Sequence, residues 1–204
     1  MKLLKKILIG LAVLIVVVVA ASAIVMRHIA RRALPDYNQT VQAPFLQEEV
    51  TVHRDQHAIP YIFAKNESDL YFTVGYVMAQ DRLWQMDLLR RVTMGRLSEI
   101  FGEDMVENDL VLRALRIPEK SAMVLAGTEP EVMAALEAFS KGVNHFMETH
   151  PNKLPLEFTL LGYQPEPWQP IHSVNLIGYM AWDLSGSWQI EATMHKLRQH
   201  LDEE

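Results

Sequence analysis

The sequence contains no cysteine, and this absence removes several kinds of chemistry at once. Without cysteine the chain forms no disulfide, offers no thiolate to a metal and has no cysteine nucleophile. It also lacks the Gly-x-Ser-x-Gly turn, the His-Glu-x-x-His pair, the phosphate-binding loop and the Gly-x-Gly-x-x-Gly turn of common enzyme sites. Taken alone, the residues indicate no enzyme. An exported chain without cysteine fits a bacterial envelope.

The chain also lacks a basic face. Its formal net charge is -6, and the basic residues are interleaved with acidic ones, so nucleic acid is not an expected partner. Half of the residues are hydrophobic and 22% are charged, which is enough apolar material for a packed core. The length suits one domain or a large piece of one.

The N-terminus carries a long apolar run. Lys2, Lys5 and Lys6 precede an uncharged stretch from Ile7 to Met26. At a rise of about 1.5 Å per residue, a helix of this length spans about 30 Å, the thickness of the hydrocarbon core of a bilayer. We therefore interpret residues 1–32 as a membrane anchor or signal segment. It places the remainder on the periplasmic or outer side of a bacterial inner membrane.

Cleavage of this segment is the alternative. Ala21-Ser22-Ala23 resembles a signal-peptidase site, and cutting there would make the protein a secreted one. The run is long for a signal peptide and stays rich in valine and isoleucine to its end, which favours an uncleaved anchor.

Residues 33–49 contain Pro35 and Pro44 and show no periodicity, so they are predicted to be a linker before a unit spanning residues 50–204. Two short strands, 50–52 and 61–64, are expected around a turn at 57–60, because Pro60 cannot donate a ladder hydrogen bond in a central strand.

Helices follow from apolar periodicity and from the residues that flank it. Ser68 is expected to cap a long helix that ends before Gly102, with a break at 93–95. Thr128 and Glu131 match a capping box for a strongly amphipathic helix. Residues 151–170 hold five prolines and are expected to form an irregular connection anchored by Trp168. The remaining helices are expected at about 104–115, 118–127, 171–184 and 187–200.

Polar side chains inside the long helix are the unusual feature of the sequence. Gln80, Asp81 and Arg82 interrupt an otherwise apolar stretch, and Asp87 stands at helical spacing from two arginines. A structural polar network is favoured here over catalysis, because buried polar groups need partners from elsewhere. The histidine pairs lie on extended segments or on different helix faces, which favours structural roles over metal binding.

The run Gly75-Tyr-Val-Met-Ala-Gln-Asp-Arg-Leu-Trp-Gln-Met86 resembles the penicillin-acylase family of N-terminal-nucleophile (Ntn) hydrolases. The motifs at 52–60, 95–102, 161–168 and 180–186 agree with that family in the same order. Two positions depart from it: Ala58 stands where the family usually has glycine, and Tyr61 where it often has histidine. The resemblance implies an α+β fold, in which this chain is the mainly helical N-terminal portion of an αββα sandwich.

The resemblance also implies an activity. Such proteins are made as precursors, and a C-terminal chain carries the N-terminal serine nucleophile whose own α-amine serves as the base. The expected function is hydrolysis of linear amides of acylated amines, such as β-lactam side chains or acyl-homoserine lactones. This chain has no catalytic residue of its own and would need that C-terminal chain as partner. A membrane-anchored, non-catalytic helical binding module, or a decayed gene fragment, is the alternative.

Site residues follow from the resemblance alone. Met180, Asp183 and Leu184 fall on positions that line the acyl-group pocket, although Met180 and Leu184 are equally well interpreted as core residues one helical turn apart. Glu191 matches a position that contributes one ligand to a structural calcium ion. Calcium takes six to eight oxygens, so Glu191 would supply one of many. No organic cofactor is expected.

Overall fold

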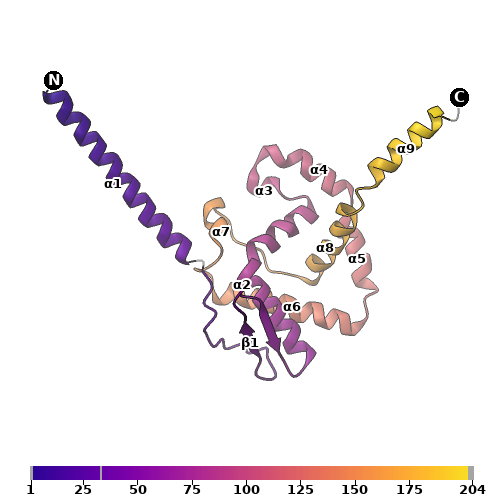
Figure 1. Ribbon diagram of the computed structural model, residues 1–204. Coiled ribbons are helices and arrows are strands. Elements are labelled where there is room, and N and C mark those ends of the chain that lie inside the picture. Colours follow the sequence, from indigo (N-terminus) through magenta and orange to yellow (C-terminus); the bar gives the residue numbers. More distant parts are fainter. Residues whose placement is uncertain (1, 33, 202–204) are drawn as a thin grey trace.

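The computed structural model describes residues 2–32 and 34–201, and it is mostly helical (Figure 1). The helices are α1 Lys2–Arg32, α2 Glu67–Met94, α3 Ser98–Phe101, α4 Val106–Ala114, α5 Ile117–Ala126, α6 Pro130–Thr149, α7 Leu156–Leu161, α8 Pro170–Asp183 and α9 Trp188–Leu201. The strands are β1 Thr51–Arg54 and β2 Pro60–Phe63, and a 3-10 turn, Glu103–Met105, precedes α4. A mainly helical α+β chain is therefore confirmed. The four-layer sandwich stays a prediction, because the described residues form a two-stranded sheet.

Helix α1 stands apart from the body of the molecule (Figure 1). Its stretch Leu4–His28 has a mean hydropathy of 3.1 and is not buried against the rest of the chain. By length and composition it can cross a membrane, and a signal sequence near an N-terminus passes the same test. The choice between anchor and cleaved signal stays a prediction.

Strands β1 and β2 form an antiparallel hairpin whose register pairs Thr51 with Phe63 and Arg54 with Pro60. The turn is built on Asp55, whose Oδ1 accepts hydrogen bonds from the backbone N–H groups of His57 and Ile59 at 2.8 and 2.9 Å. Ala58 adopts a left-handed conformation with φ 62°. This region favours glycine, because a Cβ atom there crowds the following carbonyl. The two expected strands are confirmed, shifted by one or two residues.

The N-cap of helix α2 lies two residues before the expected Ser68. Asn66 is the N-cap, and its side-chain oxygen accepts a hydrogen bond from the Asp69 N–H at 2.8 Å. The helix ends at Met94, because Gly95 takes the left-handed conformation that closes a helix. Within α2, Arg82 has non-helical dihedral angles (φ -139°, ψ 16°), which place a kink at the polar stretch noted in the sequence.

The core lies where α2 crosses α6. Two glycines allow the close approach: a Cβ atom on Gly75 would lie 2.1 Å from the Phe139 carbonyl oxygen, and one on Gly142 would lie 1.9 Å from that of Phe72. Aromatic and aliphatic side chains pack together in this core. The buried members of this core are Tyr76, Val77, Ala79, Leu83, Met86, Val143, Phe146, Phe158 and Trp168.

The expected capping box at the start of α6 is wrong. Glu129 is the N-cap and makes no side-chain cap hydrogen bond, and the Thr128 hydroxyl instead donates to the Val124 carbonyl at 2.9 Å. Pro130 occupies the first turn, which sets the start of the helix one residue later than the box requires. The proline-rich connection is also more regular than expected, because α7 lies inside it. Trp168 anchors it as predicted, with 4% of its surface exposed.

Residues 34–49 pack along α2 and α6. The Asp69 carboxylate accepts hydrogen bonds from the backbone N–H groups of Gln47 and Glu48, both at 2.9 Å. The ring of Phe45 contacts those of Phe72 and His145, with centroids 5.9 and 6.0 Å apart. The segment predicted as a linker is therefore irregular but attached to the helices. The division of the chain at residues 33 and 50 stays a prediction.

Candidate functional site

The predicted pocket residues lie at the C-terminal end of α8. Met180 and Leu184 are one helical turn apart, joined by the backbone hydrogen bond from Leu184 N–H to the Met180 carbonyl at 2.9 Å. They are 57% and 79% exposed, and Asp183 is exposed between them. Their interpretation as core residues of this chain is therefore wrong. The structure brings the three together as one exposed turn.

The opposite end of α8 is firmly held. The side chain of Gln169 accepts from the backbone N–H of His172, and the Gln169 N–H donates to His172 Nδ1 at 3.0 Å, which forms a reciprocal cap. His172 is buried, and burial, together with the charge of Arg90, lowers its pKa to about 4. The ring is therefore neutral near pH 7. Because His172 holds the first turn of α8 in the core, the helix runs from the core to the exposed turn at its C-terminal end.

Glu191 lies on α9, which projects from the body next to α8 (Figure 1). Its side chain is exposed and accepts a hydrogen bond from the Ser187 hydroxyl at 3.3 Å. Among the residues that the structure describes, no three histidine or carboxylate side chains gather into a group that could hold a metal. The contribution of Glu191 to a calcium site therefore stays a prediction.

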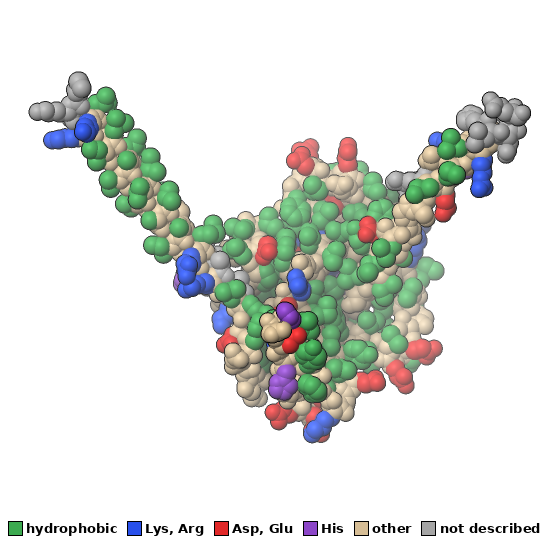
Figure 2. Space-filling model, in the orientation of Figure 1, with side chains coloured by type: hydrophobic (Ala, Val, Ile, Leu, Met, Phe, Trp, Pro, Cys, Tyr) green, Lys and Arg blue, Asp and Glu red, His purple; other side chains and the backbone are tan. Residues whose placement is uncertain are grey.

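An apolar groove of about 590 Å³ lies between α2, α6 and α8. Its rim is exposed at Tyr71, Met78 and Val132, which are 39%, 42% and 52% accessible. Figure 2 shows a broad area of hydrophobic side chains on the face in view. The groove is lined by Glu67, Tyr71, Val74, Met78, Met86, Glu131, Val132, Ala135, Leu136, Phe139, Trp168, Ser173 and Leu176. Exposed apolar surface of this extent is typical of an interaction site.

A buried ionic cluster holds the end of α2. Asp87 is 1% exposed and accepts hydrogen bonds from Arg90, from Arg91 Nε at 3.1 Å and from the Tyr163 hydroxyl at 2.7 Å. The guanidinium of Arg90, itself 1% exposed, also donates to the Glu166 carbonyl at 2.8 Å. The helical spacing in the sequence indicated the pairing of Asp87 with the two arginines, but it did not indicate that the pair is buried.

The cluster continues toward the surface. Arg91 donates to Glu99 at 2.8 Å, and Arg96 donates to Glu99 at 2.8 Å and to Glu166 at 2.6 Å. The hydrogen bond and charge of Arg96 lower the pKa of Glu166 to about 2. These contacts join α2, α3 and the connection between α7 and α8. The cluster fixes the position of that connection, and hence the start of α8.

The polar stretch of α2 forms a separate structural network, as the sequence favoured. Asp81 receives two hydrogen bonds from the Arg54 guanidinium, at 2.8 and 3.1 Å, and one from the Tyr37 hydroxyl at 3.0 Å. The guanidinium also reaches Gln80 Oε1 at 2.9 Å and lies 3.9 Å from the centre of the Tyr37 ring. The network ties the hairpin and the segment 34–49 to the kink in α2.

The sequence that forms these elements matches a known family. A family model described as penicillin amidase matches residues 49–204, which is most of the chain. The chain belongs to the penicillin amidase family.

Relatives within the penicillin amidase family act on two kinds of acyl compound, according to their names. The penicillin acylase 2 proenzyme of Pseudomonas sp. (strain SE83) is 36% identical over 162 residues, which cover 79% of this chain and 21% of the relative. The acyl-homoserine lactone acylase QuiP of Pseudomonas syringae pv. tomato is 31% identical over 156 residues, 76% of this chain and 19% of the relative. The chain thus spans about a fifth of the length of these curated relatives.

A solved structure supports the same assignment. The thermostable penicillin G acylase from Alcaligenes faecalis superposes with a TM-score of 0.62 at 30% sequence identity, over 68% of this chain and 75% of the solved chain. The family resemblance read from the motifs is therefore confirmed. The sequence predicted α6 as a strongly amphipathic helix, but it did not predict that Val132, Leu136 and Phe139 on that helix line an apolar groove.

Proposed function

We propose that this chain is the N-terminal part of an amidohydrolase that cleaves linear amides of acylated amines, in complex with a C-terminal chain that carries the N-terminal serine nucleophile. In that enzyme this chain supplies a wall of the acyl pocket and part of the scaffold. The nucleophile and its base both belong to the partner, because the base is the α-amine of the nucleophilic serine itself. An α-amine has a pKa near 8, so part of it is unprotonated at neutral pH and can accept the proton of the serine hydroxyl.

The lengths of the relatives carry the two-chain proposal. The match covers 21% of the curated proenzyme but 75% of the solved chain. The solved chain is therefore close in length to this one, whereas the proenzyme is several times longer. A family that occurs both as a long precursor and as a short N-terminal chain is expected if the precursor is cut after its N-terminal region.

The exposed apolar surface supports a large partner. On α8, Ile177, Met180 and Leu184 are 68%, 57% and 79% exposed, and they follow one another at helical spacing. Ile190, Met194 and Leu197 form a similar stripe on α9, with 67%, 49% and 49% exposure. Together with the groove on α2, α6 and α8, these stripes form the kind of exposed apolar surface that marks a protein–protein contact site.

The predicted pocket residues suit acyl recognition. The flexible side chain of Met180 adapts to acyl groups of different shape, and Leu184 adds apolar surface one turn away. Asp183 would place a negative charge at the pocket mouth. The names of the relatives include acylases of penicillins and of acyl-homoserine lactones, so we propose acylated amines of both kinds as substrates.

Two further roles complete the proposal. Glu191 would contribute one oxygen to a structural calcium ion whose other ligands lie on the C-terminal chain. Helix α1 would anchor the enzyme in a bacterial inner membrane, with the body facing the periplasm.

Co-expression tests this function. The chain is produced with the C-terminal region of the Pseudomonas sp. proenzyme, and hydrolysis of chromogenic phenylacetyl and fatty-acyl anilides is measured. We expect activity only when both chains are present. Met180→Ala should change the ratio of the two activities. Met123→Ala on α5, which removes an equally flexible and 76% exposed side chain, is the matched control and should leave the ratio unchanged. A stable complex that hydrolyses no anilide would refute the amidase proposal in favour of a binding module.

A further inference from the structure

The chain leaves α1 and joins the body within a few residues. The candidate membrane span ends at His28, and α1 continues to Arg32. The first ties to the body come at Asp36, whose carbonyl accepts a hydrogen bond from Gln80 at 3.4 Å, and at Tyr37, whose hydroxyl donates to Asp81 at 3.0 Å.

This attachment limits how far the body can lie from a bilayer. The helical residues after His28 add about 6 Å at a rise of about 1.5 Å each. Even fully extended, the residues from Arg32 to Asp36 add at most about 14 Å. The headgroup layer itself is about 5–7 Å thick on each side. A body tied down at Asp36 therefore remains next to the headgroups whenever α1 spans the membrane.

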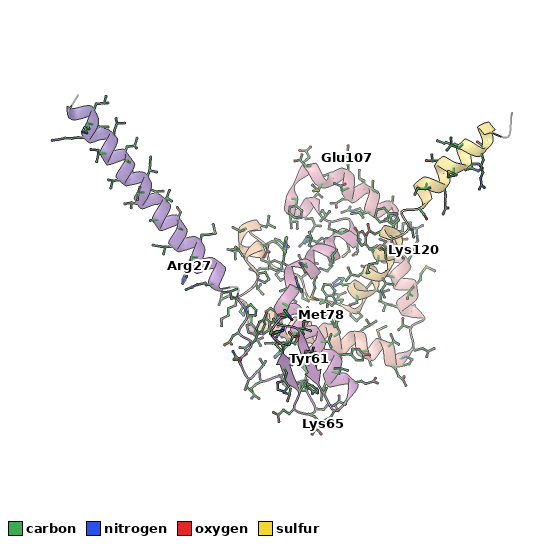
Figure 3. All side chains as sticks on the ribbon, viewed as in Figure 1. Arg27, Tyr61, Lys65, Met78, Glu107 and Lys120 are labelled. Atoms are coloured by element: carbon green, nitrogen blue, oxygen red, sulfur yellow. The ribbon has the colours of Figure 1, made fainter. Side chains whose placement is uncertain are left out.

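The surface at this junction is basic. Arg31 of α1 and Lys153 of the connection between α6 and α7 line the same hollow, of about 670 Å³, together with Leu34, Asn152 and Leu154. Within residues 2–32 and 34–201, neither Arg31 nor Lys153 has an ion-pair partner. Figure 2 shows basic side chains in blue where α1 meets the body, and Figure 3 labels Arg27 there, one helical turn before Arg31.

We propose that this junction surface, formed by Arg31, Leu34, Asn152, Lys153 and Leu154, lies on the bilayer, where Arg31 and Lys153 bind the phosphate groups of anionic lipids. The inference rests on the proposed anchoring by α1. The occupant follows from position and charge: the hollow continues directly from the membrane helix, and two unpaired cations there are complementary to headgroup phosphates. The leucines at its edge suit the boundary between headgroups and acyl chains.

The absence of cysteine makes the test simple, because a single introduced cysteine can be labelled without other changes. Asn152→Cys places a fluorophore on the junction surface. Lys120→Cys on α5 is the matched control, since both positions are exposed and Lys120 lies on the side of the body away from α1 (Figure 3). The full chain is reconstituted into vesicles of phosphatidylcholine and phosphatidylglycerol, with and without a headgroup spin-labelled quencher. Quenching is expected to be several-fold stronger at position 152 than at position 120.

Charge reversal tests the phosphate contact itself. Lys153→Glu, made together with Asn152→Cys, should reduce the quenching several-fold in these anionic vesicles. Lys120→Glu, made in the same Asn152→Cys chain, should leave the quenching unchanged. If the chain floats with the vesicles but the label at 152 is quenched no more than the label at 120, or if Lys153→Glu has no effect, the inference is overturned while the anchor stands. A chain that does not float overturns the anchor and the junction surface together.

Discussion

Asp87→Asn removes a buried negative charge from between two arginines and leaves the size of the side chain unchanged. In the folded chain the Asp87 carboxylate accepts from Arg90, Arg91 and the Tyr163 hydroxyl. An asparagine retains one acceptor oxygen. Its N–H₂ group replaces the second oxygen and cannot accept a hydrogen bond from the arginine and tyrosine donors around it. The guanidinium of Arg90, which is 1% exposed, would then lie in the interior without a counter-charge, whereas Arg91 would keep its ion pair with Glu99 at 2.8 Å.

The expected loss is large because removing one partner of a buried pair leaves the other charge uncompensated. Such changes cost about 3–5 kcal/mol, against a total stability of about 5–15 kcal/mol for a typical domain. Urea unfolding of the full chain in detergent micelles measures the loss, with an expected fall in the midpoint of about 2 M. Tryptophan fluorescence reports on this region, because Trp168 lies 5.9 Å from the Arg90 guanidinium and Trp84 lies 6.2 Å from the Tyr163 ring.

An exposed ion pair of the same sequence spacing is the control. Arg116, the N-cap of α5, and Glu119 in its first turn are also three residues apart and form an ion pair, but both side chains are largely exposed. Glu119→Gln should therefore leave the midpoint unchanged, since water already solvates both charges. Equal midpoints for Asp87→Asn and the unchanged chain would refute the reasoning, because they would mean that the cluster contributes nothing to the fold.

Three further changes test other parts of the structure. Gly142→Ala should lower the free energy of unfolding, measured in urea, by more than about 3 kcal/mol, because its Cβ would lie 1.9 Å from a carbonyl oxygen of α2. The control is Gly186→Ala, whose Cβ meets no atom within 4 Å and which should leave the stability unchanged. Equal effects of the two changes would disprove the close helix crossing. Because the pKa of His172 is lowered to about 4, the unfolded chain takes up the proton first, and stability should fall by up to about 3 kcal/mol as the pH drops from about 6.5 to 4. His172→Asn should flatten that pH dependence, and an unaltered slope would count against the buried neutral ring. Ala58→Gly should raise stability by about 0.5–1 kcal/mol, since the left-handed φ of 62° then carries no Cβ strain; a lower melting temperature would contradict this.

Local signals predicted most of the helices and the hairpin. Pro118 and Gly127 bound α5 as expected, and the apolar spacing of α6 placed it correctly. The errors arose where two local signals competed. Thr128 fitted a capping box, but Pro130 fixes the first turn of α6 and leaves the Thr128 hydroxyl to the preceding helix. Helix α7 was hidden by the prolines around it, although residues 156–161 contain none.

The site was harder to predict than the fold, because its features depend on contacts distant in sequence. Asp87 is buried by Tyr163 and by the connection that carries Glu166, and no pattern near Asp87 shows that these segments return to it. The exposure of Met180 and Leu184 also could not be derived from periodicity, since an apolar face looks the same whether its own chain or another covers it. Their assignment to a pocket rests on the family motifs.

The packing of residues 34–49 also determines where a stable recombinant form of this protein can begin. The family match starts at residue 49, which invites truncation at that point. A protein shortened in this way would lose the backbone N–H groups of Gln47 and Glu48 that hydrogen-bond to the Asp69 carboxylate, and it would expose the rings of Phe72 and His145 that Phe45 contacts. The unit that folds therefore begins well before the unit that is recognised by similarity. A soluble version without the apolar helix should keep every residue from Leu34 onward.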